Sequence, residues 1–140
     1  MKILLAVDGS AHTKKMLAYL VTHEELLAPS NSFTLMTVQP QLPPRARSMV
    51  GKEAVESYQR EEAEKVLGPA SQFLMRHGIN PKSVAKVGHA GETLCKAANA
   101  GGFDLVVMGS HGHGVFGNLV MGSVATQVLS QSKVPVLLVR

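Results

Sequence analysis

The hydrophobic residues of this chain form short apolar runs, separated by longer stretches in which apolar positions recur every three to four residues. The first run, Lys2–Val7, is apolar on both faces, which is typical of a central strand in a parallel sheet. Spacings of three and four are typical of an amphipathic helix. The patterns predict strands at Lys2–Val7, Ser32–Val38, Ser83–His89, Phe103–Met108 and Val134–Val139, and helices near Ala11–Leu27, Lys52–His77, Gly91–Ala100 and Gly122–Gln131.

The order of these elements predicts the fold class. Four strand–helix pairs followed by a last strand are typical of an α/β domain with right-handed crossovers. We expect a single-domain three-layer sandwich over residues 1–140, with a five-stranded parallel sheet flanked by about four helices. Ligands of such sheets bind at the carboxyl ends of the strands. Three loops are expected there: Asp8-Gly9-Ser10, Val38-Gln39-Pro40 and Gly109–Gly122.

Two segments that contain proline interrupt this regular pattern. Pro40–Arg47 is rich in proline and basic, and we interpret it as a mobile loop inside the domain. Gly68-Pro69 lies within the second predicted helix and is expected to kink it, since proline lacks the N–H donor.

Composition narrows the class of protein. The chain is 45% hydrophobic, so it can form a core, yet no apolar run approaches the roughly 20 residues of a membrane span. The opening run Ile3–Val7 is also shorter than the h-region of a signal peptide, which takes about 7–15 residues. Cys95 is the single cysteine, which excludes a disulfide framework and fits a reducing compartment. We therefore expect a soluble, cytoplasmic protein.

The net charge of +4 suggests an anionic partner. Residues 105–140 contain Lys133 and Arg140 and no acid, so the excess is not a dense basic stripe of the kind that binds nucleic acid. Aromatic residues make up 4% of the chain and tryptophan is absent, which leaves few rings for stacking on bases. A small anionic ligand is the better prediction, with neither nucleic acid nor membrane as partner.

The segment 109–123 holds five of the thirteen glycines. It follows the fourth predicted strand and leads into the last helix. Glycine lets a backbone approach a ligand closely, and the N–H groups at a helix N-terminus attract anions, most often phosphate. The alternative is a flexible turn without a ligand.

Two common phosphate motifs do not fit this segment. A P-loop has the right glycine spacing from Gly112 to Gly117, but Asn118 stands where the lysine belongs. The dinucleotide fingerprint is matched by Gly112, Gly114 and Gly117. It lies after the fourth strand instead of the first, and no acid follows Asp104 to bind a ribose.

A third pattern, Gly-x2-Gly-x9-Gly-Ser/Thr, fits without a gap at Gly109, Gly112, Gly122 and Ser123. Together with other motifs in the same order, it makes the whole chain resemble the ATP-binding branch of the universal stress protein family, whose fold is Rossmann-like. The other motifs are Val7-Asp8-Gly9-Ser10, Thr37-Val38-Gln39-Pro40, Gly91-Glu92, Asp104–Ser110 and Val134–Val139.

The resemblance implies a nucleotide, ATP or AMP, lying across the strand ends. It implies that Asp8 lies near the ribose and leaves room for Mg²⁺ held through this carboxylate. Val38 would contact the adenine edge through its backbone, and Met108 and Gly109 would lie under adenine and ribose. The full set of implied nucleotide-binding residues is Ala6, Val7, Asp8, Val38, Met108, Gly109, His111, Gly112, His113, Gly122, Ser123 and Val124.

One departure affects the phosphate end. Many relatives carry lysine or arginine within the nine-residue spacer, whereas His113–Met121 has no fixed positive charge. Triphosphate binding is then expected to be weaker, or aided by His111, His113, Arg45 or Arg47, with histidine helping mainly below its pKa of about 6.5.

Several residues have a second interpretation. Asp8 could cap the first helix, although Ser10 could do so as well. His111 and His113 could bind a metal, but a pair of histidines without further ligands more often lies in solvent. Cys95 is expected to be a small core residue. A triad of Ser123, His111 and Asp8 can be written, but nothing in the spacing selects it.

Enzymatic chemistry is not favoured. Phosphoanhydride hydrolysis needs a metal held by acids and a positioned base, and Asp8 is the one acid near the predicted crevice, so ATPase activity should be slow or absent. Asp8-Gly9-Ser10 stands where nucleotidyltransferases carry His-x-Gly-His, and a response regulator would need paired acids there. Two classes remain: a nucleotide-binding stress protein, and an interaction module without nucleotide. The family often pairs its last strand across a two-fold axis, so we expect a homodimer through Val134–Val139.

Overall fold

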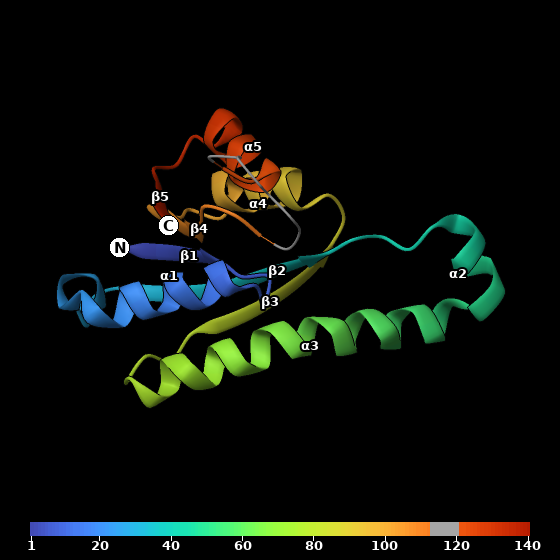
Figure 1. Ribbon diagram of the computed structural model, residues 1–140, viewed down its shortest axis with the longest axis horizontal. Coiled ribbons are helices and arrows are strands. Elements are labelled where there is room, and N and C mark those ends of the chain that lie inside the picture. Colours follow the sequence, from blue (N-terminus) through green and yellow to red (C-terminus); the bar gives the residue numbers. More distant parts are fainter. Residues whose placement is uncertain (113–120) are drawn as a thin grey trace.

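The computed structural model describes residues 1–112 and 121–140 and shows a five-stranded, fully parallel sheet in the order β3-β2-β1-β4-β5 (Figure 1). Its strands pair in register, with Leu4 opposite both Thr34 and Val106. The arrangement confirms the predicted fold class. The strands are β1 (Lys2–Ala6), β2 (Ser32–Gln39), β3 (Lys82–Val87), β4 (Leu105–Gly109) and β5 (Val136–Val139).

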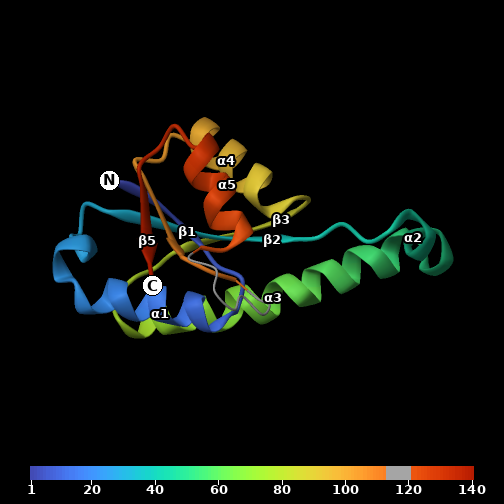
Figure 2. The same cartoon turned by 45° about the horizontal axis from the view of Figure 1, so that its top comes forward.

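Helices cover both faces of the sheet and make three layers. Helices α1 (Ala11–Thr22) and α3 (Lys52–Arg76) lie on one face, and α4 (Ala90–Ala100) and α5 (Ser123–Gln131) lie on the other (Figures 1 and 2). No helix among the described residues is long and apolar enough to cross a membrane.

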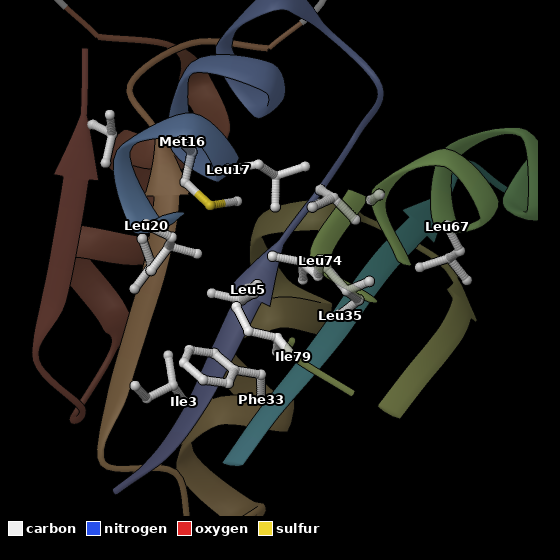
Figure 3. Packing of buried hydrophobic residues seen from close by; sticks show 14 of the residues in the cluster. Ile3, Leu5, Met16, Leu17, Leu20, Phe33, Leu35, Leu67, Leu74 and Ile79 are labelled. Carbon is white, nitrogen blue, oxygen red and sulfur yellow. The ribbon is translucent and has the colours of Figure 1, made fainter. Parts of the chain in front are cut away.

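Alternation along β1 divides the core between the two faces. Ile3, Leu5 and Val7 pack toward α1 and α3, while Leu4 and Ala6 pack toward α4 and α5. This double burial explains why Ile3–Val7 has no polar position. Figure 3 shows the cluster on the face covered by α1 and α3, in which side chains of β1 and β2 meet those of the two helices. The residues labelled there are Ile3, Leu5, Met16, Leu17, Leu20, Phe33, Leu35, Leu67, Leu74 and Ile79.

The first helix is shorter than predicted. It ends at Thr22, and a 3₁₀ turn, η1 (Glu24–Leu27), follows. His23 leaves helical geometry at φ −118° and ψ 86°, its Nδ1 lies 2.7 Å from the carbonyl oxygen of Tyr19, and its ring stacks on the Tyr19 ring. The histidine therefore closes the helix end, which apolar spacing could not reveal.

The segment Pro40–Arg47 is not a loop throughout, as the sequence suggested. Helix α2 (Pro44–Val50) begins inside it, with Pro44 in the first turn, where a missing N–H is tolerated. Gly51, at φ +83°, turns the chain back into α3. Figures 1 and 2 show α2 and the adjoining turns of α3 projecting beyond the sheet, and we call α2 with residues 51–60 the arm.

The predicted kink at Gly68-Pro69 does not interrupt the helix, because α3 runs from Lys52 to Arg76 with Pro69 inside it. Pro69 is exposed, so its ring faces solvent, while the neighbouring Leu67 and Ala70 are buried against the sheet. Packing of the buried side holds the helix together despite the missing donor.

Cys95 is buried on α4, as expected of a small core residue. Its surroundings raise the pKa of the thiol through burial, which keeps the sulfur in the unreactive protonated form.

Candidate nucleotide-binding site

A cavity of about 240 Å³ opens at the carboxyl ends of β1, β2 and β4. It brings together eleven of the twelve residues named from the sequence, although they come from three separate parts of the chain. The twelfth, His113, lies outside the described residues. The eleven are Ala6, Val7, Asp8, Val38, Met108, Gly109, His111, Gly112, Gly122, Ser123 and Val124.

Five residues that were not predicted from the sequence also line the cavity. Met36 could have been found, because it lies two positions before Val38 and therefore on the same face of β2. Leu94 and Ala125 come from the facing helices, and their place depends on how these helices pack. The five are Thr13, Met36, Ala90, Leu94 and Ala125.

One side of the cavity is apolar. Met36 and Met108 are almost fully buried on β2 and β4, the two strands that flank β1, and Leu94 from α4 lines the same cavity. Val38 adds a partly exposed side chain at the rim. This side suits a flat, weakly polar group such as a nucleobase.

Asp8 is held in place by Thr13. The Thr13 hydroxyl donates to Oδ1 of Asp8 at 2.8 Å, and the backbone N–H of Asp8 donates back to the same hydroxyl oxygen at 3.0 Å. The backbone N–H of Ser10 also donates to Oδ1, at 2.9 Å. The carboxylate is thus fixed at the cavity wall by two donors to a single oxygen.

The capping role falls to Ser10 instead of Asp8. Ser10 is the N-cap of α1, and its hydroxyl accepts from the backbone N–H of Thr13 at 3.4 Å. The structure therefore separates the two roles that the sequence left open for Asp8.

Two glycines are required by close approach. A Cβ at Gly112 would lie 2.5 Å from Oδ2 of Asp8, and one at Gly109 would lie 2.8 Å from the Cβ of His12. Any larger residue at either position would displace the acid or the first helix.

Helix α5 begins at the cavity without a side-chain cap from the described residues. Its N-cap is Gly122, whose own N–H donates to the carbonyl oxygen of Ser110 at 2.8 Å. Ser123 and Val124, the first residues of the helix, line the cavity. The N–H groups of a helix's first turn have no partner within the helix, and together with the helix dipole they favour an anion at such a position.

Histidine is the sole cationic residue type that the described lining can offer. His111 lies on the cavity wall, with its Nδ1 2.9 Å from the hydroxyl of the buried Ser110, and its ring lies 4.9 Å from that of His12. Arg45 and Arg47 do not line this cavity. Within residues 1–112 and 121–140, no three His, Cys, Asp or Glu side chains form a group that could hold a metal.

The family model for the universal stress protein family matches residues 1–140. The chain is 34% identical to the universal stress protein Slr1230 of Synechocystis, over 99% of this chain but 42% of that longer protein. It is 34% identical to a universal stress protein of Thermus aquaticus, encoded in the QAH/OAS sulfhydrylase 3′ region, over 99% of this chain and 97% of that one.

Solved structures agree with the sequence comparisons. The structure of hypothetical protein MJ0577 of Methanocaldococcus jannaschii matches with a TM-score of 0.83 and 25% identity, over 99% of this chain and 94% of the other. The Archaeoglobus fulgidus universal stress protein in complex with dAMP has the same fold, with a TM-score of 0.67 and 20% identity over 100% and 98% of the two chains. On the family model and these relatives, the chain belongs to the universal stress protein family.

Proposed function

We propose that this chain binds an adenine nucleotide, ATP or AMP, and acts in the stress response by nucleotide-dependent signalling or protein interaction. The observation that carries the proposal is the convergence of eleven predicted residues on one cavity at the strand ends. The dAMP complex of a protein with the same fold supports it.

The cavity has the chemistry that a nucleotide needs. The base would lie against Met36, Met108 and Leu94, and the backbone at Val38 would meet its polar edge. The phosphates would lie at Gly112 and at the first turn of α5, where Ser123 offers a hydroxyl. Position 112 favours glycine, because a Cβ there would lie 2.5 Å from Oδ2 of Asp8.

Mg²⁺ would bind through Asp8 together with the phosphates. This ion commonly takes one or two carboxylates, substrate oxygens and water, so a single acid suffices for it. Asp8 is the one acid among the described lining residues, and its position is fixed by Thr13. The bound ion would supply a fixed positive charge, since no lysine or arginine is among the described lining residues.

Hydrolysis should be slow or absent. Phosphoryl transfer relies on cationic side chains around the transferred group and on a residue that positions water. No lysine or arginine lines the described cavity, and the Asp8 carboxylate is already engaged by Thr13 and Ser10. The site suits retention of a nucleotide better than turnover.

The test is to denature the purified protein and chromatograph the small molecules that it releases. We expect an adenine nucleotide, and a rise in melting temperature when ATP or AMP is added with Mg²⁺, because a ligand of the folded state stabilises it. Protein that releases no nucleotide and shows no thermal shift with either one would contradict the proposal. That result would favour the second candidate, an interaction module without nucleotide. The large apolar side chains that are exposed on the arm support this candidate, namely Met49, Val50 and Tyr58.

We also propose a homodimer through Val134–Val139. β5 is an edge strand of four aliphatic residues, and Val136, Leu137 and Leu138 are partly exposed on it. An uncharged edge of this kind favours pairing with a second copy.

A further inference from the structure

A second cavity lies beside the arm. Its volume is about 490 Å³, within the range of small-ligand sites, and its walls come from α2, the start of α3 and the end of β3. It shares no lining residue with the nucleotide cavity. The proposed nucleotide function therefore leaves it unexplained.

Arg47 is the distinctive group of this cavity. Its Nε is buried and has no hydrogen-bond partner among the residues that the structure describes. A buried donor without a partner is unfavourable, and native proteins rarely leave one without a reason. Arg47 also lines the cavity, and its guanidinium fork matches the two oxygens of a carboxylate, so an anion bound there is a suitable partner for this side chain.

The charge of the lining selects a monoanion. Lys52 lies 4.0 Å from Glu56, so these opposite charges offset each other. The lining residues Arg47, Lys52 and Glu56 then carry a formal net charge of +1, and Arg47 lies outside the Lys52–Glu56 pair. One carboxylate matches this charge better than a phosphate dianion does.

The cavity also has an apolar part. Val55 is buried on α3, whereas Val87, the last residue of β3, is 46% exposed. An aliphatic group placed on Val87 would remove apolar surface from water. A ligand with a carboxylate and a short aliphatic group would satisfy both Arg47 and Val87.

We propose that this second cavity binds a monocarboxylate with a short aliphatic group, with the carboxylate on Arg47 and the aliphatic group against Val87. Such a group occurs in a free small acid and at the C-terminus of a polypeptide that ends in an aliphatic residue. The proposal is independent of nucleotide binding in the first cavity.

The test is a titration of the ¹⁵N-labelled protein followed by NMR, in which the Nε–H of Arg47 is a direct reporter. The probes are 3-methylbutanoate and a five-residue peptide that ends in valine. We expect saturable shifts at Arg47, Ser48 and Val87 with at least one probe, and the tighter probe identifies the source. The matching amides should bind at least about tenfold more weakly, because they lack the charge.

Two variants form a matched pair. Arg47→Gln should weaken binding at least about tenfold, whereas Arg45→Gln, which removes the same charge from an exposed position on α2 outside the cavity, should leave it unchanged. Val87→Ser should weaken binding by removing the apolar contact without changing the charge of the cavity, which keeps the test valid if Arg47→Gln perturbs α2. The proposal is overturned if neither probe saturates, if R47Q binds like R45Q, or if inorganic phosphate binds more tightly than both probes.

Discussion

At the scale of single residues, the hydroxyl of Thr13 fixes the carboxylate of Asp8 at the wall of the proposed nucleotide cavity. It accepts from the backbone of Asp8 and donates to the Asp8 carboxylate, and the residue is buried. Without this hydroxyl, both the N–H and the carboxylate would lose a partner in a partly dry environment. The acid would then be held by Ser10 alone among the contacts described above.

We therefore expect Thr13→Val to lower the free energy of unfolding by about 1–3 kcal/mol, since it removes both hydrogen bonds to Asp8. It should also weaken Mg²⁺-dependent nucleotide binding. Urea unfolding and calorimetric titration measure the two effects. Thr22→Val is the control, because this exposed hydroxyl on the same helix contacts backbone carbonyls of its own helix and its loss should cost under about 0.5 kcal/mol. Equal losses in the two variants would disprove the role of Thr13.

The same scale shows what the sequence could predict of the site. Gly112 and Gly122 were found because glycine spacing marks a backbone that must come close to something, and this requirement is visible in the order of residues. Thr13 was missed because its role depends on a turn that folds it back onto Asp8, five positions earlier. Leu94 was missed because only the packing of α4 places it over the cavity.

At the scale of elements, the helices that begin near the cavity differ in whether a side chain caps their N-terminus. Ser10 caps α1 with its side chain, whereas α4 and α5 have no side-chain cap from the described residues. In the proposed complex, the N–H groups at the start of α5, beside Ser123, would meet the phosphate oxygens. We therefore expect the phosphates at α5 and not at α1, whose first turn Ser10 already caps.

We expect Ser123→Ala to weaken ATP binding by about threefold to tenfold, because it removes one neutral hydrogen bond at the phosphate end. Isothermal titration calorimetry measures the effect. Ser130→Ala is the matched control: it lies on the same helix, its hydroxyl donates to the Gln127 carbonyl, and it is outside the cavity. An affinity for ATP that is identical in both variants would exclude Ser123 from the phosphate site.

Among the elements, α2 departs most from the prediction. The prolines and arginines of Pro40–Arg47 suggested a loop, but a proline in the first turn is compatible with a helix, and Gly51 provides the turn into α3. A seven-residue helix has too few apolar positions to produce a period. The long elements were predicted because burial imposes a pattern on them, and α2 has no buried residue.

At the scale of the whole molecule, the fold followed from the sequence because each strand of the centre is buried on both faces. β1 and β4 lie side by side in the middle of the sheet, and their apolar runs admit no other placement. The assembly is a separate question, which depends on the two edges of the sheet, β3 and β5.

We expect the protein to have a mass of about twice 14.9 kDa by light scattering. Val136→Lys places a charge on the partly exposed β5 edge and should give a monomer. Ala85→Lys, an equivalent change on the exposed edge strand β3, should leave the dimer intact. Circular dichroism checks that both variants fold. A wild-type monomer at working concentration, or a dimer in V136K, would contradict this assembly.

The two edges of the sheet also differ in a way that limits the size of the assembly. β3 carries the exposed Lys82 and Lys86, and charges on an edge oppose the addition of a further strand, whereas β5 has none. A sheet that could extend at both edges would grow into an open filament. With one edge protected, growth through β5 would stop at two copies in the proposed assembly, and the lysines of β3 would oppose further polymerisation.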